Sequence, residues 1–363
     1  MQIFYDGEIY IRQSLGGINR YFYNLISRLP SEYEPIITSL KSYENNLPSH
    51  PNLTLHSYNR FGIKPGRLSF ALEPYYFGLL EKVSNYQIFH PTYHYLLTRE
   101  KLRKRKKPIV LTVYDLLQEV LPELIDPTGK ETDFKKSAIL AADVIICISE
   151  STKRDLLHYY PVSEEKVFVT HLATELNISL NSESPLPPSP YILYVGSRHG
   201  HKNFDRLLLA FSNLIKKDTN IKLCVVSHPF SDEENKRIFS LHLNEHIHLI
   251  SWVDDSYLVK LYKNCLCFVY PSLYEGFGIP PLEAMICQAP VIASNTSSIP
   301  EVVGDAGLLF NPLSTDELTD RLLFLLDNSI VRQNLITRGL QQVKKFSWDK
   351  TVQQTVSIYN SLV

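Results

Sequence analysis

The chain has 363 residues, with 37 Lys and Arg against 38 Asp and Glu, so its formal net charge is −1. This length predicts about two domains, each with a full hydrophobic core, and excludes a single small module. The balanced charge argues against a dedicated nucleic-acid binder, which normally has a strong basic excess. No apolar run is long enough to span a membrane and the N-terminus lacks the order of a secretory signal, so we expect a cytoplasmic protein.

Short β-branched runs alternate with segments of helical periodicity, which is typical of parallel sheets built from βαβ units. In the first half the pattern predicts strands at 2–6, 35–39, 86–90, 108–115, 143–149 and 166–172. Residues 177–190 interrupt the alternation, because four prolines among serines fit neither a helix nor a central strand. We therefore expect a first domain over 1–176 and a linker over 177–190.

After this segment the alternation restarts, which predicts a second domain over 191–345. Its expected strands are 191–196, 222–227, 246–251, 266–272 and 290–294. Helices are expected at 203–216 and 232–241, from Asp255 and from Pro280, with two more helices towards the C-terminus. Two such sets indicate two doubly wound α/β domains, in which ligands bind at the carboxyl ends of the strands.

The cysteines indicate neither a disulfide framework nor a zinc site. There are five, an odd number, and they lie in apolar stretches. No histidine stands at a ligand-like interval from Cys265 and Cys267. We expect reduced thiols in the core.

The densest motif runs from Cys267 to Phe310 and passes from a buried strand through a glycine-rich turn into a helix. Gly276 and Gly278 allow a ligand to approach the backbone, and the helix near Pro280 points its positive end at the same place, which favours an anion. Glu275 and Glu283 flank this turn with seven residues between them. Carboxylates suit ribose or sugar hydroxyls as hydrogen-bond acceptors, although either glutamate alone is also compatible with an ordinary helix-start or surface position.

Together these residues resemble the Glu-x7-Glu signature of the family-4 retaining glycosyltransferases. The resemblance covers nearly the whole chain and implies the GT-B fold, in which two doubly wound Rossmann-like domains face a central cleft. It implies that the first domain binds the acceptor, that the second binds a nucleotide sugar, and that residues 346–363 form a helix crossing back to the first domain. It also implies that Glu275 contacts the donor sugar and that Glu283 holds the ribose.

A second motif, Tyr191 to Phe211, ends a strand at Gly196 and continues into a loop with Arg198 and Lys202. A guanidinium and an ammonium at a strand end suit a diphosphate, and they help most where charge grows on a leaving group. The string resembles the Arg…Lys-Asn motif of the same family, which contacts the donor diphosphate. The resemblance assigns donor binding to Gly16, Gly17, Val253, Gly276, Phe277, Gly278 and Glu283. Trp252, beside the expected base site, is either a packing or a stacking residue.

The acceptor half carries polar residues at expected strand ends, namely His90, His94, Tyr114 and Asp115. Family members often place a histidine near the transferred sugar, and the resemblance carries this catalytic role to His90, although a structural histidine is an equal alternative. The family commonly has His-Asp where this chain has Tyr114-Asp115. Lys101 to Lys107 contains six basic residues in seven, which is either a solvated loop or a patch for anionic lipid.

These features predict a retaining glycosyltransferase that moves a hexose from a nucleotide-diphosphate sugar to a glycan or lipid-linked acceptor in surface polysaccharide synthesis, with GDP-mannose ahead of a UDP-sugar. Catalysis is assigned to Glu275, Arg198, Lys202 and His90. No two aspartates stand two positions apart, so the Asp-x-Asp metal motif is missing and we expect no metal or other cofactor. A nucleotide-sugar 2-epimerase and a non-catalytic nucleotide-sugar-binding protein remain the alternatives.

Overall fold

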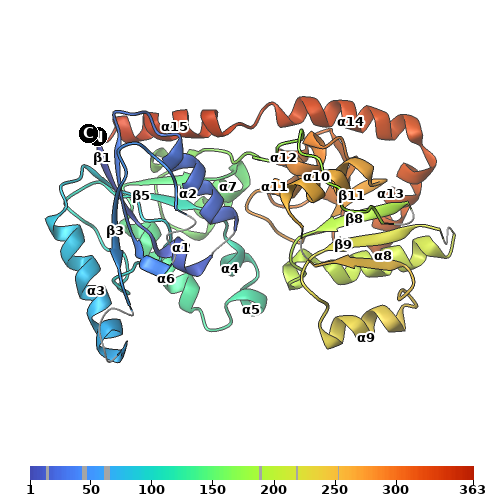
Figure 1. Cartoon of the computed structure of the whole chain (residues 1–363), viewed down its shortest axis with the longest axis horizontal. Helices are drawn as coiled ribbons and strands as arrows, with labels where there is room; N and C mark the ends of the chain where they lie inside the picture. Colours follow the sequence, from blue (N-terminus) through green and yellow to red (C-terminus); the bar gives the residue numbers. More distant parts are fainter. Residues whose placement is uncertain (14–15, 43–46, 61–65, 188–189, 218–219, 252) are drawn as a thin grey trace. The chain divides into compact units, whose positions relative to one another are not determined.

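The computed structural model describes residues 1–363 except 14–15, 43–46, 61–65, 188–189, 218–219 and 252 (Figure 1). The chain divides into two compact units. Unit 1 comprises Met1–Leu172 and Ser347–Val363, and unit 2 comprises Ala173–Phe346. Each unit is an α/β layer structure with an all-parallel sheet.

The sheet of unit 1 consists of β1 (Gln2–Asp6), β2 (Glu34–Leu40), β3 (Thr54–Tyr58), β4 (Ile88–Phe89), β5 (Val110–Val113), β6 (Val144–Cys147) and β7 (Val167–Val169). Two ladders, β3-β2-β1-β4 and β5-β6-β7, are joined by a parallel bridge between Phe89 and Ile109. This is the order of a Rossmann-like sheet. The sequence did not predict β3, whose side chains are largely exposed at the sheet edge.

The helices of unit 1 are α1 (Glu8–Arg12), α2 (Gly17–Ser27), α3 (Gly66–Val83), α4 (Leu117–Val120), α5 (Pro122–Ile125), α6 (Lys130–Ala141), α7 (Glu150–Tyr159) and α15 (Trp348–Asn360). The last of these is the C-terminal helix. Tyr359 of α15 is fully buried and its hydroxyl lies 3.1 Å from that of Tyr5 on β1. Thr351 donates a hydrogen bond to the carbonyl of His171. The C-terminal helix is therefore part of the core of unit 1.

Unit 2 has the strand order β10-β9-β8-β11-β12-β13. Its strands are β8 (Tyr191–Val195), β9 (Lys222–Val226), β10 (Ile247–Ile250), β11 (Cys267–Tyr270), β12 (Val291–Ser294) and β13 (Gly307–Phe310). Its helices are α8 (Phe204–Ile215), α9 (Asp232–Ser240), α10 (Asp255–Asn264), α11 (Ile279–Ile286), α12 (Ile299–Val303), α13 (Thr315–Asp327) and α14 (Ser329–Val343). The chain winds outward in one direction from β8 and in the other from β11, so these neighbouring strands form the topological switch point.

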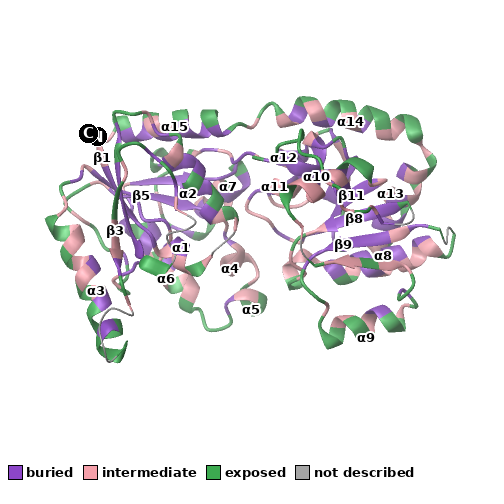
Figure 2. Cartoon of the chain, viewed as in Figure 1, coloured by how far each residue is buried: buried purple, intermediate pink, exposed green. Residues whose placement is uncertain are grey.

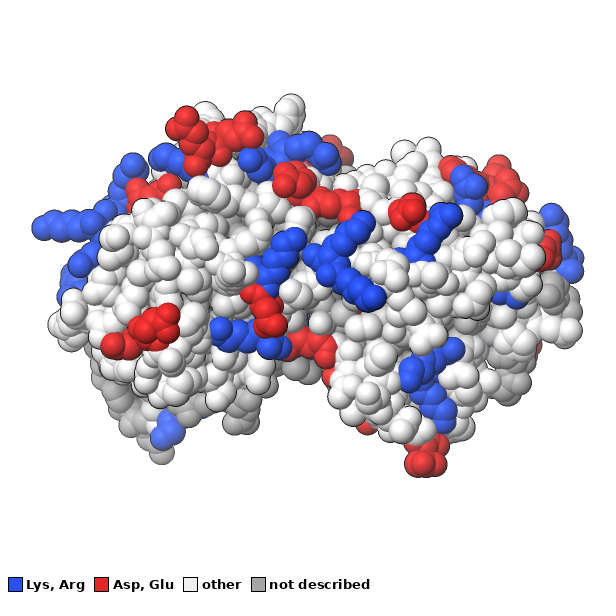
Figure 3. Space-filling model, turned by 90° about the horizontal axis from the view of Figure 1, so that it is seen from above, with Lys and Arg blue, Asp and Glu red and all other residues white. Residues whose placement is uncertain are grey.

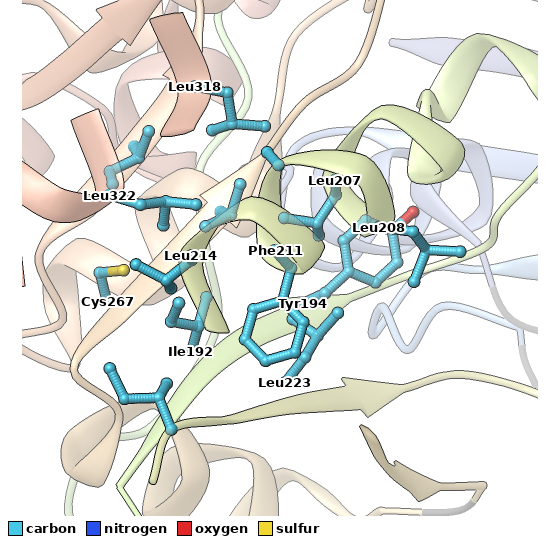
Figure 4. Close-up of a cluster of buried hydrophobic side chains, with 14 of the residues drawn as sticks. Ile192, Tyr194, Leu207, Leu208, Phe211, Leu214, Leu223, Cys267, Leu318 and Leu322 are labelled. Carbon is cyan, nitrogen blue, oxygen red and sulfur yellow. The ribbon is translucent and has the colours of Figure 1, made fainter. Parts of the chain in front are cut away.

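The buried residues concentrate in the sheets and on the helix faces that cover them (Figure 2). On the face shown in Figure 3, acidic and basic side chains are intermingled, in keeping with the net charge of −1. Figure 4 shows one core cluster of unit 2, in which Phe211 and Leu214 of α8 lie with Ile192, Cys267 and Leu322. All five cysteines are unbridged, and only Cys265 is not fully buried.

The segment expected as a linker lies along α10 where the structure describes it. Lys260 donates to the carbonyls of Ser182 at 3.0 Å and Ser184 at 2.7 Å, and the Tyr257 hydroxyl donates to that of Pro185 at 2.7 Å. These contacts explain why the compact unit begins at Ala173, ahead of the proline-rich run.

Candidate functional site

The loops that follow β8, β11 and β13 are fastened together at the switch point of unit 2. The side-chain amide of Asn203 donates to the carbonyls of Pro271 at 3.0 Å and Pro312 at 2.8 Å. Asn203 itself has a left-handed backbone, with φ of 56°, a conformation that asparagine tolerates better than most residues. The amide of Leu273 also donates to the carbonyl of His201 at 2.7 Å. Sequence reasoning did not identify this fastening role of Asn203.

These loops bring Lys202 and Glu275 into contact, although 73 positions separate them. Lys202 Nζ donates to the two carboxylate oxygens at 2.7 and 3.0 Å. Both side chains reach solvent, with exposed fractions of 21% and 12%. Beneath them, burial and the nearby Glu275 carboxylate raise the pKa of Tyr270 well above its ordinary value, so its hydroxyl stays protonated. Lys202 and Glu275 thus form a partly exposed ion pair next to the uncharged hydroxyl of Tyr270.

The backbone around Glu275 is fixed by two serines that sequence reasoning missed. The amide of Glu275 donates to Ser297 Oγ at 2.9 Å. The hydroxyl of Ser298 lies 2.9 Å from the carbonyl of Glu275 and 2.6 Å from that of Phe277, so it donates to this pair. These contacts hold the glycine-rich turn rigid before any ligand binds.

Helix α11 starts directly after this turn. Gly278 has φ of 120°, a conformation that L-residues rarely adopt, so glycine is required there. Pro280 and Pro281 stand at the second and third helical positions and have no N–H group. The positive end of the helix faces the turn as expected, but the amides that can donate to an anion are fewer than in an ordinary helix start.

Glu283 lies on the second turn of α11 and is buried, with 6% of its surface exposed. The hydroxyl of Tyr262 donates to it at 3.4 Å. The ring of Phe277 is buried and packs edge-on against Phe346 at 5.6 Å. Val253 is partly buried beside the core of unit 2, whereas Trp252 lies outside the described residues.

Arg198 is not brought together with Lys202 and Glu275. Its guanidinium donates to Glu234 of α9 at 2.6 and 2.9 Å, and to the carbonyls of His228 and Pro229 at 2.9 and 3.0 Å. Only 2% of the side chain is exposed. The Arg198 guanidinium lowers the pKa of Glu234. In this structure Arg198 therefore holds the loop against α9, and its contact to a diphosphate stays a prediction.

His90 lies in the interior of unit 1. It is fully buried, and its ring nitrogens lie 2.6 Å from Tyr359 Oη and 2.9 Å from Thr112 Oγ1. Burial lowers its pKa to about 3, so the ring is neutral near pH 7. Both ring nitrogens are thus engaged inside unit 1 in this structure, and the role of His90 near the transferred sugar stays a prediction.

The other acceptor-half residues line a pocket of about 40 Å³ in unit 1. His94, Tyr114, Asp115 and Lys135 are among its walls. Burial lowers the pKa of His94, which lies 3.0 Å from Glu131. Lys135 is buried and donates to Glu119 at 2.9 Å.

Gly16 and Gly17 stand at the start of α2 in unit 1, with Gly16 as the N-cap. No helix in the described ranges combines the length and the apolar character that a membrane span requires. Within those ranges, no group of three or more His, Cys, Asp or Glu side chains is arranged to hold a metal ion.

Two family models match consecutive parts of the chain. Residues 15–177 match "Glycosyltransferase Family 4" and residues 180–342 match "Glycosyl transferases group 1". The chain belongs to these glycosyltransferases. It is therefore an enzyme of the GT-B fold, as the resemblance in the sequence implied.

Known proteins support this assignment along the full length. The chain is 28% identical to the O-antigen chain mannosyltransferase B of Escherichia coli, over 97% of this chain and 98% of that protein. The serotype-specific mannosyltransferase WbdA of Escherichia coli is 29% identical over 70% of this chain, which spans 33% of that longer protein. Among solved structures, sucrose-phosphate synthase from Thermosynechococcus elongatus has a TM-score of 0.75 at 21% identity. The match covers 100% of this chain and 99% of the synthase chain.

Proposed function

We propose that this glycosyltransferase transfers mannose from a nucleotide-diphosphate sugar to a glycan or lipid-linked acceptor during surface polysaccharide synthesis. The proposal takes GDP-mannose as the first candidate donor and a UDP-sugar as the second. The relatives that support mannose are the two mannosyltransferases of Escherichia coli and an α-(1→4)-mannosyltransferase of Mycolicibacterium hassiacum, which is 30% identical over 60% of this chain and 54% of that protein.

The contact between Lys202 and Glu275 at the switch point carries the proposal. The ammonium group and the positive end of α11 stabilise the negative charge that grows on the departing diphosphate. The Glu275 carboxylate accepts hydrogen bonds from hydroxyls of the donor sugar, and Glu283 accepts from the ribose. Arg198 supports the loop that presents Lys202, since its guanidinium is bound to Glu234 and two carbonyls.

The proposed reaction retains the configuration at the anomeric carbon without an enzyme nucleophile. The acceptor hydroxyl attacks from the side of the leaving group, the bond from C1 to the diphosphate oxygen breaks, and the hydroxyl proton passes to that phosphate oxygen. The nucleoside diphosphate and the new glycoside are the products. We propose that Lys202 supplies the charge stabilisation that a divalent ion gives in metal-dependent transferases, so no metal is needed.

The test is turnover of GDP-mannose, UDP-glucose and UDP-galactose with polysaccharide-repeat and lipid-linked acceptors, with and without EDTA. We expect GDP-mannose to be consumed only when an acceptor is present, equally with and without chelator, and the product to keep the donor's anomeric configuration in its NMR spectrum. Lys202→Met and Glu275→Gln should abolish most turnover, whereas Lys216→Met, on the exposed end of α8, should not. Donor consumed without acceptor would indicate the epimerase, and binding without turnover the non-catalytic protein.

A further inference from the structure

Helix α3 exposes a continuous apolar stripe. Leu68, Leu72, Tyr75, Leu79 and Val83 recur every three or four residues and therefore share one helix face. Their exposed fractions are 49%, 40%, 76%, 61% and 69%. Figure 2 shows the outer side of α3 as largely exposed. Single exposed apolar side chains are normal on a surface, but an aligned row of five is a mark of an interaction site.

The stripe is not the face that is buried against the rest of unit 1. Ser69, Glu73 and Phe77, on another face of the helix, are buried. The ring of Phe77 packs against Tyr58 of β3 and Tyr76 at 6.2 and 5.3 Å. Polar substitutions within the stripe should therefore leave the fold intact.

The charges on α3 leave its outer side cationic. Its two carboxylates are neutralised from within unit 1, because Glu73 pairs with Arg99 at 3.2 Å and Glu81 pairs with Arg105. The remaining charged residues of the helix, Arg67 and Lys82, are both basic and exposed.

The basic segment Lys101–Lys107 is attached to this helix through the pair between Arg105 and Glu81. Arg103, Lys104, Lys106 and Lys107 are exposed, and none has an ion pair within the described residues. Lys101 pairs with Asp133 and is not counted among them. Within the described residues, four cations without an ion pair thus flank Arg105, the residue that ties this segment to α3.

We propose that α3 and Lys101–Lys107 form a docking surface for a bilayer that contains anionic lipid. An amphipathic helix with aromatic and aliphatic residues on one face lies in the bilayer interface with that face immersed, and neighbouring cations add attraction to anionic headgroups. The cations need not share the face of the stripe, because their attraction extends over a Debye length of about 8–10 Å. A second copy of the chain fits the same face less well, since it would bring Arg67 and Lys82 towards the same cations.

The inference goes beyond the transferase reaction and is tested without donor or acceptor, so it can fail while the proposed function stands. The full chain is sedimented with vesicles of phosphatidylcholine alone, or with about 30% phosphatidylglycerol, at ionic strengths from about 0.1 to about 0.5 M. We expect binding to the anionic vesicles that weakens as salt rises. Vesicles of phosphatidylcholine alone should bind at least tenfold less.

Two variants separate the apolar and ionic contributions. The stripe variant, Leu72→Ser with Tyr75→Ser and Leu79→Ser, should lose at least tenfold in vesicle affinity at unchanged melting temperature. Lys104→Glu with Lys106→Glu should lose more than about fivefold per side chain, because each change removes a positive charge and adds a negative one. The matched controls lie in unit 2, where Phe239 and Ile330 are 70% and 76% exposed and Lys216 and Lys217 are exposed. Phe239→Ser with Ile330→Ser, and Lys216→Glu with Lys217→Glu, should bind like the unchanged protein.

Three outcomes would overturn the proposal. The first is absence of binding to anionic vesicles, and the second is a stripe variant that binds as well as the unchanged protein. The third is a concentration-dependent dimer in light scattering that the stripe variant abolishes, because that result would assign the face to a second copy of the chain.

Discussion

Removing Lys202 and removing Arg198 should affect different properties of the enzyme, because the structure gives these two basic residues different partners. Lys202→Met deletes an ammonium that is 21% exposed and contacts Glu275. Arg198→Met deletes a guanidinium that is 2% exposed and makes four hydrogen bonds to α9 and the chain before it. The first change should affect the reaction, and the second should affect the fold.

The contacts set the size of each effect. Loss of a group that stabilises transition-state charge costs about 2.7–4 kcal/mol, or about 10²–10³ in kcat, whereas a partly exposed ion pair contributes about 0–1 kcal/mol to stability. For Arg198, two carbonyls lose their donors at about 1 kcal/mol each. The Glu234 carboxylate, still 26% exposed and open to water, adds about 1 kcal/mol more. A loss of about 3 kcal/mol corresponds to a fall in Tm of about 6–12 °C for a domain of this size.

Transfer kinetics and calorimetric unfolding of the same preparations measure both quantities. Arg198→Lys is the intermediate control, because it keeps the charge but not the planar set of donors. Its Tm should lie between those of Arg198→Met and the unchanged protein. Suppose instead that Arg198→Met melts like the unchanged protein and loses kcat as severely as Lys202→Met. The guanidinium would then act on the diphosphate, and the positioning role argued here would be refuted.

Three further substitutions test other features. Gly278→Ala should cost about 1–3 kcal/mol through backbone strain at φ of 120° and lower donor affinity, whereas Gly66→Ala, with open space around its Cβ position, should do neither; equal Tm values would contradict the strain. Since burial lowers the pKa of His90 to about 3, the unfolded chain binds a proton below about pH 6.5 that the folded chain refuses until about pH 3. The stability of unit 1 should therefore decrease as the pH is lowered through that window. His90→Gln should reduce the decrease in Tm between pH 7.5 and pH 4.5, and identical pH profiles for the two proteins would contradict this role of His90. Asn203→Gly keeps the left-handed backbone but loses two hydrogen bonds, so it should lower Tm and kcat. Asn203→Ala should lower the free energy of unfolding by about 1 kcal/mol more, because alanine disfavours that backbone conformation. Equal Tm values for the two variants would show that the backbone conformation contributes nothing.

The strands of unit 2 were predictable because most are continuous apolar runs bounded by turn residues, as in Cys267–Tyr270 and Val291–Ser294. Strand β3 was not, since its exposed edge position removes the apolar signal. Two elements after Ser294 were also missed. Helix α12 has only five residues, and β13 is only partly buried, so neither gives a clear pattern in the sequence. Burial on both faces, more than position in the sequence, decided which strands could be found.

The site residues also differ in how far the sequence could place them. The sequence could place Glu275 and Lys202 at the same edge of the sheet, because parallel strands have their carboxyl ends at one edge, but it did not predict the contact between them. The direction of Arg198 could not, because its partner Glu234 lies 36 positions away on α9 and nothing in the loop sequence points to it. The contact of His90 could not be predicted for a similar reason, since its partner Tyr359 comes from the C-terminal helix, 269 positions later. The positions of predicted strand ends locate residues at the carboxyl edge of a sheet, but they do not show which helix contacts those residues.

The ion pair between Lys202 and Glu275 has a consequence for how the donor must bind. Before binding, each charge satisfies the other; afterwards the ammonium is proposed to face the diphosphate and the carboxylate the sugar hydroxyls. Removing either partner leaves the other without its counter-charge, so the two losses should not add. We expect Lys202→Met with Glu275→Gln to lose less transfer activity than the product of the single losses, with a coupling of about 0.5–3 kcal/mol. Multiplicative losses in this double-mutant cycle would show that the two side chains act independently and that their contact in the free enzyme has no part in catalysis.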